Sequence, residues 1–263
     1  MNAQTSNPNQ QARIMADSRL NFFLHFRKAG GTRIVNLAIA NGETLWPRHD
    51  NGKPCDESGI TKDLSSMNHL DATDFFNEAI RKKITFVSAS GGKELVEAAL
   101  NHPNVRTICS LRNPGKTCLS NYNYDYYLGL TNERKLPSYL HRTEYSNPFT
   151  RSLLGHENSG HREEEPVNEA IRLLQQFDLL IRLGDSDSDS KTRDETGWSN
   201  FDVKSHSTSG EDRLWKIYNL MIKGRLIRAF ELMSGKKRGN LQDIPSNSIK
   251  LDSELMERLF EID

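Results

Sequence analysis

Residues 22–33 of the chain read Phe22-Phe23-Leu24-His25-Phe26-Arg27-Lys28-Ala29-Gly30-Gly31-Thr32-Arg33. The apolar run over residues 20–26 is typical of a buried strand, and it stops at a basic pair followed by two glycines. Beyond the glycines, apolar residues recur with the spacing of a helix, at Ile34, Val35, Leu37 and Ala38. A strand, a glycine turn and a helix in this order point free backbone N–H groups and the positive end of a helix dipole at one place.

This arrangement predicts a cradle for a phosphate or sulfate group. The two glycines let the backbone approach an anion closely, Lys28 adds a mobile charge, and Thr32 adds a hydroxyl donor. A glycine pair between a strand and a helix is also common as a plain tight turn, but the flanking basic pair and threonine favour the cradle. The spacing differs from that of a Walker A loop, in which the lysine follows the last glycine, and from the dinucleotide fingerprint G-x-G-x-x-G.

The loop over residues 27–33 resembles the 5′-phosphosulfate loop of sulfotransferases that use 3′-phosphoadenosine-5′-phosphosulfate (PAPS), and most closely that of the carbohydrate sulfotransferases. The resemblance implies an α/β fold with a mostly parallel central sheet flanked by helices, the P-loop-NTPase-like sulfotransferase fold. It also implies that the loop binds the 5′ end of PAPS through Arg27, Lys28, Ala29, Gly30, Gly31, Thr32 and Arg33.

A second match to this family covers residues 111–122, which read Leu111-Arg112-Asn113-Pro114-Gly115-Lys116-Thr117-Cys118-Leu119-Ser120-Asn121-Tyr122. They resemble the 3′-phosphate motif R-D-P-x-x-R-x-x-S-x-Y, from which Asn113 and Lys116 depart. An arginine at the end of a strand and a serine two turns into the next helix can converge on one phosphate through charge-assisted hydrogen bonds. The resemblance therefore assigns Arg112 and Ser120 to the 3′-phosphate, and by position it assigns Lys204 and Ser205 to a loop over the adenosine.

Strand and helix patterns alternate along much of the remaining chain, which predicts a mostly parallel sheet. The patterns predict a helix capped by Asp71 that runs to about residue 83, strands over 84–88 and 105–111, and a helix over 93–100 between them. They also predict a long core-facing helix over 211–233 and a last short helix capped by Asp252. The tyrosines over residues 122–127 have the spacing of core packing.

The domain organisation follows from length and composition. The 263 residues favour one domain over 17–263, preceded by a flexible polar tail over 1–16. The alternating Ser and Asp residues that begin at Gly184 predict a flexible acidic loop over about 184–197, because no EF-hand spacing accompanies them.

The charge balance limits the classes of partner. Lys and Arg number 35, as do Asp and Glu, so no global field favours nucleic acid or an acidic membrane surface. The three cysteines fall in no metal-ligand spacing, and Cys109 reads as a reduced core residue. No apolar run is long enough for a membrane span, and the chain departs from Golgi family members, which carry an N-terminal anchor. We therefore expect a cytoplasmic protein that recognises anions locally, with no nucleic acid, membrane or metal partner.

The resemblance implies transfer of a sulfuryl group from PAPS, with release of adenosine 3′,5′-bisphosphate (PAP). The acceptor would be a hydroxyl or amine of a carbohydrate or small metabolite, and neither its identity nor the oligomeric state follows from the sequence. Lys28 would stabilise the leaving oxygen. Several family members place a catalytic histidine on the second strand, where this chain has Ser88-Ala89-Ser90. Other branches of the family use a Glu that follows the cradle helix. The candidates for the base in that region are Glu43, His49 and Asp50, of which Glu43 and His49 come first, whereas His25 reads as a core histidine of the first strand.

Two other functions stay open. An ATP-dependent P-loop-like kinase is disfavoured because Lys28 precedes the glycines and no Walker B strand with a terminal Asp is evident. A non-catalytic nucleotide-binding module is consistent with the missing histidine on the second strand.

Overall fold

The computed structural model describes residues 19–141, 145–154, 164–203 and 210–260. The predicted tail over 1–16 and the predicted cofactor residues Lys204 and Ser205 lie outside the described residues.

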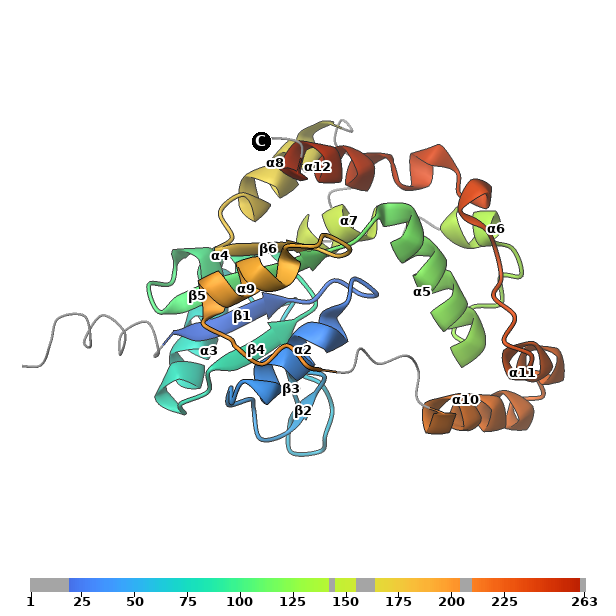
Figure 1. The fold of residues 1–263 in the computed structure, drawn as a ribbon, viewed down its shortest axis with the longest axis horizontal. Coiled ribbons are helices and arrows are strands. Elements are labelled where there is room, and N and C mark those ends of the chain that lie inside the picture. Colours follow the sequence, from blue (N-terminus) through green and yellow to red (C-terminus); the bar gives the residue numbers. More distant parts are fainter. Residues whose placement is uncertain (1–18, 142–144, 155–163, 204–209, 261–263) are drawn as a thin grey trace, which may run out of the picture.

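A four-stranded parallel sheet forms the centre of the molecule (Figure 1). Its strands are β1 (Leu20–Leu24), β4 (Phe86–Ala89), β5 (Val105–Leu111) and β6 (Leu179–Arg182), in the order β4-β1-β5-β6. In register, Leu24 of β1 pairs with Ala89 on one side and with Cys109 on the other. The segments that follow β1, β4 and β5 therefore leave the sheet at the same edge, and the predicted α/β class with a parallel sheet and flanking helices is confirmed.

Helices connect and cover these strands. The helices before the acidic stretch are α2 (Gly31–Ala40), α3 (His69–Arg81), α4 (Lys93–Asn101), α5 (Pro114–Leu128), α6 (Leu136–Leu140), α7 (Pro148–Leu154) and α8 (Glu164–Leu174). Those after β6 are α9 (Ser188–Thr196), α10 (Gly210–Ile222), α11 (Leu226–Met233) and α12 (Lys250–Phe260). A small hairpin of β2 (His49–Asp50) and β3 (Lys53–Pro54) lies between α2 and α3 in the chain.

The alternation of side chains along β1 builds a core on each face of the sheet. Phe22 and Leu24 pack with α3, α4, α8 and α12 on one face, whereas Phe23 packs with α2 and Trp198 on the other. A third apolar cluster joins α5 to α6 and contains Tyr122, Tyr126 and Tyr127. The predicted core role of the tyrosine run is confirmed for these three residues, whereas Tyr124 is 36% exposed.

Three local predictions are corrected. The cap of α3 is Asn68, whose Oδ1 accepts the backbone N–H of Asp71 over 2.9 Å, so Asp71 lies inside the helix. Asp252 lies inside α12, and its carboxylate accepts the backbone N–H groups of Phe149 and Thr150, so it caps α7 instead of its own helix. The acidic stretch predicted as a loop over 184–197 contains α9, in which Asp189 of the first turn and Arg193 of the last turn complement the helix dipole.

The long helix predicted over 211–233 is two helices, α10 and α11. Gly224, with a φ of 67°, lies between them in the left-handed region that ends helices. Its apolar residues are not core-facing as predicted. Those expected in the core but exposed are Leu214, Tyr218, Met221, Ile222, Phe230 and Met233. Amphipathic spacing marks an apolar stripe but does not determine what covers it.

The three cysteines, Cys55, Cys109 and Cys118, are free and buried, and Cys109 lies in β5 as predicted. Within the described ranges, the helices are too short or too polar for any of them to cross a bilayer. Those ranges also hold no group of three or more His, Cys, Asp or Glu side chains placed to share a metal ion.

Candidate functional site

The glycine loop joins β1 to α2 at the carboxyl edge of the sheet. Lys28, with a φ of 63°, and Gly30, with a φ of 81°, both adopt the left-handed backbone, which turns the chain sharply into the helix. The hydroxyl of Ser110 on β5 donates to the carbonyl oxygen of Ala29 over 2.7 Å, which anchors the loop to the neighbouring strand. The first turn of α2 therefore faces the space beyond the sheet edge, as predicted.

Side-chain packing adds a second reason for the two glycines. A Cβ at Gly31 would overlap the imidazole of His25, and one at Gly30 would lie 2.6 Å from Cδ1 of Leu183. The His25 ring stacks on Phe23, with centroids 5.4 Å apart. His25 thus fills the space under the loop, so the packing of the fold by itself requires glycine at position 31.

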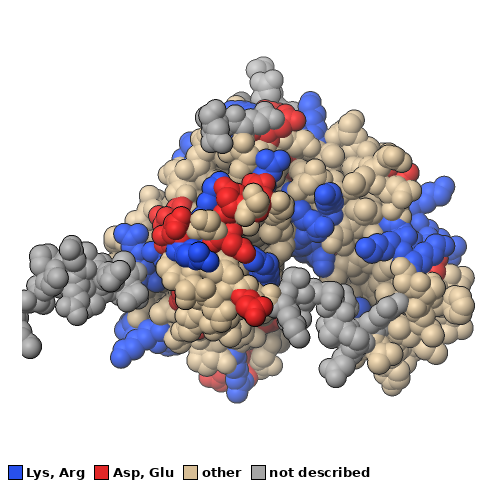
Figure 2. All heavy atoms as spheres, viewed as in Figure 1, with Lys and Arg blue, Asp and Glu red and all other residues tan. Residues whose placement is uncertain are grey.

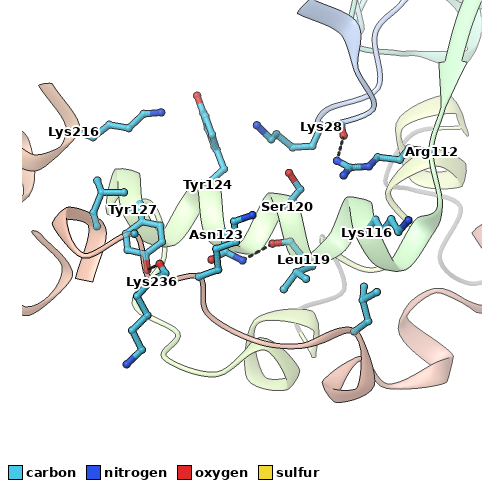
Figure 3. Close-up of a pocket in the computed structure, with 14 residues that line it drawn as sticks. Lys28, Arg112, Lys116, Leu119, Ser120, Asn123, Tyr124, Tyr127, Lys216 and Lys236 are labelled. Atoms are coloured by element: carbon cyan, nitrogen blue, oxygen red, sulfur yellow. Dashed lines mark hydrogen bonds between the residues drawn. The ribbon is translucent and has the colours of Figure 1, made fainter. Parts of the chain in front are cut away.

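Two cavities meet at this loop. The first, here called the cradle cavity, has a volume of about 620 Å³ and is lined by loop residues, by the β2–β3 hairpin and by Ser90 and Ser152. The second, here called the α5 cavity, has a volume of about 580 Å³ and lies between α5 and the segment that includes α10 and α11 (Figure 3). Four residues line both cavities: Lys28, Arg112, Ser120 and Tyr124.

The lining of the two cavities is strongly basic although the chain has no net charge. The basic residues are Arg27, Lys28, Arg33, Lys53, Arg112, Lys116, Lys216, Lys236 and Lys237. Among the lining residues in the described part of the chain there is no Asp or Glu. Figure 2 shows blue side chains gathered between the part of the molecule that holds the sheet and the part that holds α10 and α11. Local anion recognition was the expectation from composition, and this lining is suited to it.

Arg112 and Ser120 lie together with Lys28, as the motifs predicted. Arg112 follows β5, and its Nη1 donates to the carbonyl oxygen of Lys28 over 3.3 Å. Asn113, which stands where the resembled motif has Asp, caps α5 by accepting the N–H of Lys116 over 3.0 Å. The cap starts α5 directly after Arg112, and Ser120 then lies on the face of the helix that borders both cavities (Figure 3).

Tyr124 is a further feature of the shared wall. Nζ of Lys28 lies 4.6 Å from the centroid of its ring, and Nζ of Lys216 lies 5.5 Å from the same centroid. In Figure 3, Tyr124 rises from α5 between these two lysines. Cζ of Arg27 lies 5.0 Å from this centroid as well. A partly exposed aromatic ring beside three cations provides a surface against which a flat base can stack.

Two of the predicted cofactor residues have acidic partners. Arg27 forms an ion pair with Asp125 of α5, a carboxylate that also accepts the hydroxyl of Tyr139 over 2.7 Å. Nη2 of Arg33 lies 2.8 and 2.9 Å from the two carboxylate oxygens of Asp189 on α9. Their charges are therefore partly neutralised inside the protein, whereas the guanidinium of Arg112 donates to a neutral carbonyl oxygen.

The protonation equilibria indicate a positive field in the cradle cavity. Burial, followed by the charges of Lys216, Arg27 and Arg112, lowers the pKa of Lys28. Burial also lowers the pKa of Lys53, against an opposing contribution from Asp50 and with a smaller lowering contribution from Arg27. Burial, together with Lys53 and Lys28, lowers the pKa of His25 to about 4. An anion bound here would oppose the lowering of the pKa of Lys28 and of His25, because it would stabilise their positive forms.

The two candidate bases are not brought to the cradle cavity. Glu43 lies near the amino end of β1, where its Oε1 accepts hydrogen bonds of 2.8 Å from Asn21 and Trp198. His49 is exposed on β2, and its Nδ1 accepts the N–H of Gly52 over 3.3 Å. Neither residue lines either cavity, so the structure corrects both assignments: Glu43 ties the opposite end of the sheet together, and His49 closes the hairpin turn.

Other residues of the cradle cavity were missed from the sequence. Lys53 comes from the hairpin, and its Nζ donates to the hydroxyl of Ser90, which follows β4. On this side the cavity continues into a third one of about 240 Å³, which shares Lys53 and Ser90. Ser90 could have been found, because residues that follow a parallel strand share the edge with the loop. No sequence pattern around Lys53 predicts that it lines the cavity.

Comparisons with known proteins add no information about this site. The chain matches no family model, no curated protein and no solved structure. The residues that line the two cavities can together hold an extended polyanion. One end would meet the amides and lysine of the loop, and the other would meet Arg112, Ser120 and the lysines of the α5 cavity.

Proposed function

We propose that this chain is a PAPS-dependent sulfotransferase with the P-loop-NTPase-like sulfotransferase fold. It would move the sulfuryl group from PAPS to a hydroxyl or amine of a carbohydrate or small metabolite and release PAP. The observation that carries the proposal is the meeting of Lys28 and Arg112, which line the same two cavities from the ends of adjacent strands. One bisphosphorylated nucleotide can then contact both.

The binding mode follows from the two cavities. The loop amides, Lys28 and Thr32 hold the 5′-phosphosulfate in the cradle cavity, and Arg112 and Ser120 hold the 3′-phosphate at the shared wall. The adenine lies in the α5 cavity against Tyr124, and Lys116, Lys216, Lys236 and Lys237 surround it. PAPS carries about four negative charges. The surplus of cations over carboxylates in the lining is suited to this charge.

The transfer is an in-line displacement in which charge grows on the oxygen between the phosphate and the sulfuryl group. A bond forms between the acceptor oxygen or nitrogen and sulfur while the bond from sulfur to the bridging oxygen breaks. The acceptor gives up its proton to solvent water in the open cradle cavity, and Lys28 stabilises the negative charge on the departing phosphate. The acceptor approaches from the side of Lys53 and Ser90, where the cradle cavity continues into the third cavity.

Thermal unfolding in the presence of nucleotides tests the binding part of this proposal. We expect PAP and PAPS to raise the melting temperature, with a stabilisation of about 2.7 kcal/mol at a ligand concentration 100 times Kd. 5′-AMP should stabilise less, because it lacks the group that meets Arg112. Equal stabilisation by Mg-ATP would contradict the proposal and favour the kinase.

A pair of arginine variants tests the residue assignment. Arg112→Gln should weaken PAP binding by about 10-fold or more, because a charge-assisted bond to the 3′-phosphate is lost. It should leave 5′-AMP binding nearly unchanged. Arg172→Gln, at an exposed arginine of α8, is the matched control and should bind both nucleotides as the native protein does. Equal loss for both nucleotides would contradict the placement of the 3′-phosphate.

A non-catalytic PAP-binding module is the second candidate. The observation that favours it is the composition of the cradle cavity, whose described lining includes no carboxylate and has His25 as its histidine, with a pKa of about 4. A general base at neutral pH would have a pKa nearer to 7. Turnover of PAPS with a panel of acceptors distinguishes the candidates, since the module would bind PAP but transfer no sulfuryl group.

A further inference from the structure

Helices α10 and α11 expose an unusually large apolar surface, here called the α10–α11 face. Its members are large side chains with exposed fractions between 52% and 72%: Leu214, Trp215, Tyr218, Met221, Ile222, Leu226, Ile227 and Phe230. Isolated apolar residues on a surface are ordinary, whereas these eight are concentrated on two consecutive helices. The patch does not overlap the residues that line either cavity.

The spacing of these residues places them on one side of each helix. In α10 they occur at 214, 215, 218, 221 and 222, and in α11 at 226, 227 and 230, which is the i, i+1, i+4 pattern of a packing stripe. Leu220 and Ala229, in contrast, are 1% and 3% exposed. The two helices pack against each other and against α5. In Figure 1 they lie at the end of the molecule that is remote from the sheet.

The exposed apolar area of the α10–α11 face is large enough for a protein–protein interface. Eight large side chains, each more than half exposed, present on the order of 1,000 Å² of apolar surface, whereas the largest patch on a typical monomer is about 300–600 Å². A standard protein interface buries about 800 Å² on each partner. The face therefore has the area that one side of a stable dimer requires.

We propose that the α10–α11 face is where a second copy of this chain docks. A two-fold axis brings the same patch of both subunits together, so a face made of two adjacent helices pairs with itself into a four-helix layer.

The dimer has a consequence for the nucleotide site. Lys216 of α10 and Leu232 of α11 line the α5 cavity, from the sides of these helices that do not belong to the α10–α11 face. Covering the face would hold both helices against α5 and fix that wall. Dimerisation should therefore strengthen PAP binding. This coupling rests on the proposed function, whereas the proposal of a dimer is independent of it.

Sedimentation velocity of the full chain over a range of concentrations tests the proposal. We expect a species of twice the 30.0 kDa chain mass that dissociates on dilution. Tyr218→Glu combined with Phe230→Glu should sediment as a monomer with an unchanged far-UV circular dichroism spectrum. The control is Ile60→Glu, at a residue that is 66% exposed and outside the face, and it should remain dimeric. A native monomer at every concentration, or a dimer that the double variant leaves intact, would overturn the proposal.

Tryptophan quenching provides a measurement that needs no variant. Trp46 and Trp198 are 7% and 3% exposed, whereas Trp215 lies in the face and is 60% exposed. Iodide should therefore quench about one third of the tryptophan residues in dilute protein and almost none in concentrated protein. Unchanged quenching across the dissociation range would place the contact elsewhere. Binding of a monomer to phosphatidylcholine–phosphatidylserine vesicles through this face would also overturn the proposal in favour of a membrane.

Discussion

The guanidinium of Arg112 donates a hydrogen bond from Nη1 to the backbone carbonyl oxygen of Lys28 over 3.3 Å. The two residues are far apart in the chain, but β1 and β5 are adjacent and parallel, with Leu24 paired to Cys109. The contact fixes the separation between the two ends of the proposed nucleotide site. A ligand with anionic groups at both ends is thereby distinguished from one with a single phosphate.

Replacing Lys28 should affect transfer more than binding. In Lys28→Met the charge that meets the leaving oxygen is lost, and we expect turnover of PAPS to fall by about 100-fold or more. PAP affinity should fall less, because Arg112 and Ser120 remain. The control is Lys83→Met, since Lys83 has a similar left-handed φ of 58° but lies outside both cavities. Equal losses in the two variants would point to the backbone instead of the charge.

Gly31→Ala should destabilise the fold even without ligand. The new Cβ would overlap the His25 ring, and relieving the overlap by moving the loop or ring should cost about 1–3 kcal/mol. The double variant Gly31→Ala with His25→Ala should recover part of this loss, because the added methyl group then enters vacated space. Chemical denaturation of the four proteins gives the coupling energy. Additive effects would show that the ring and the glycine do not interact.

His25 should make stability depend on pH below neutrality. Its pKa is about 4 in the folded protein and about 6.5 in the unfolded chain, so the unfolded chain binds more protons between these values. Stability should therefore fall as the pH decreases from 6.5 to 4, by up to about 3 kcal/mol. Above pH 6.5 this contribution should be constant.

The His25 contribution is isolated by comparison with His25→Gln. Burial raises the pKa of Asp252 to about 6, which gives an opposite trend in the same range, and both proteins share it. The difference in free energy of unfolding between the native protein and the variant should therefore change with pH as His25 titrates. A constant difference from pH 7 to pH 4 would contradict the lowered pKa. In NMR titrations, saturating PAP should raise the pKa of the His25 imidazole.

Releasing Arg33 should strengthen anion binding. Asp189→Asn removes the carboxylate that holds the Arg33 guanidinium, and PAPS affinity should rise by up to about 5-fold, as expected for a partly exposed ion pair of at most about 1 kcal/mol. Asp187→Asn removes the same charge from a neighbouring position whose partner is Lys191, so it serves as the control. Calorimetric titration at low and high salt measures both. The same gain in each variant would indicate only a change in net charge.

The prediction that Glu43 lies near the glycine loop is wrong for a geometric reason. Glu43 is close to the loop in sequence, but α2 has ten residues and returns the chain by about 15 Å along the sheet. Its carboxylate therefore reaches Asn21 and Trp198 at the amino end of β1. Distance along the chain is a poor guide to the site when a whole helix lies between two residues.

The sequence by itself determined the parts of this protein that depend on local order. These are the strand, glycine turn and helix around Lys28, the strand and following helix around Arg112, and the parallel sheet that places both at one edge. Periodicity is a property of consecutive residues, so it can be recognised in the chain alone. Only the tertiary structure decided that Lys53 and Lys216 join the same cavities, that Asp189 pairs with Arg33, and that the apolar stripes of α10 and α11 are left uncovered. Each of these depends on which distant segments pack together, and that is set by the fit of whole surfaces instead of by local sequence.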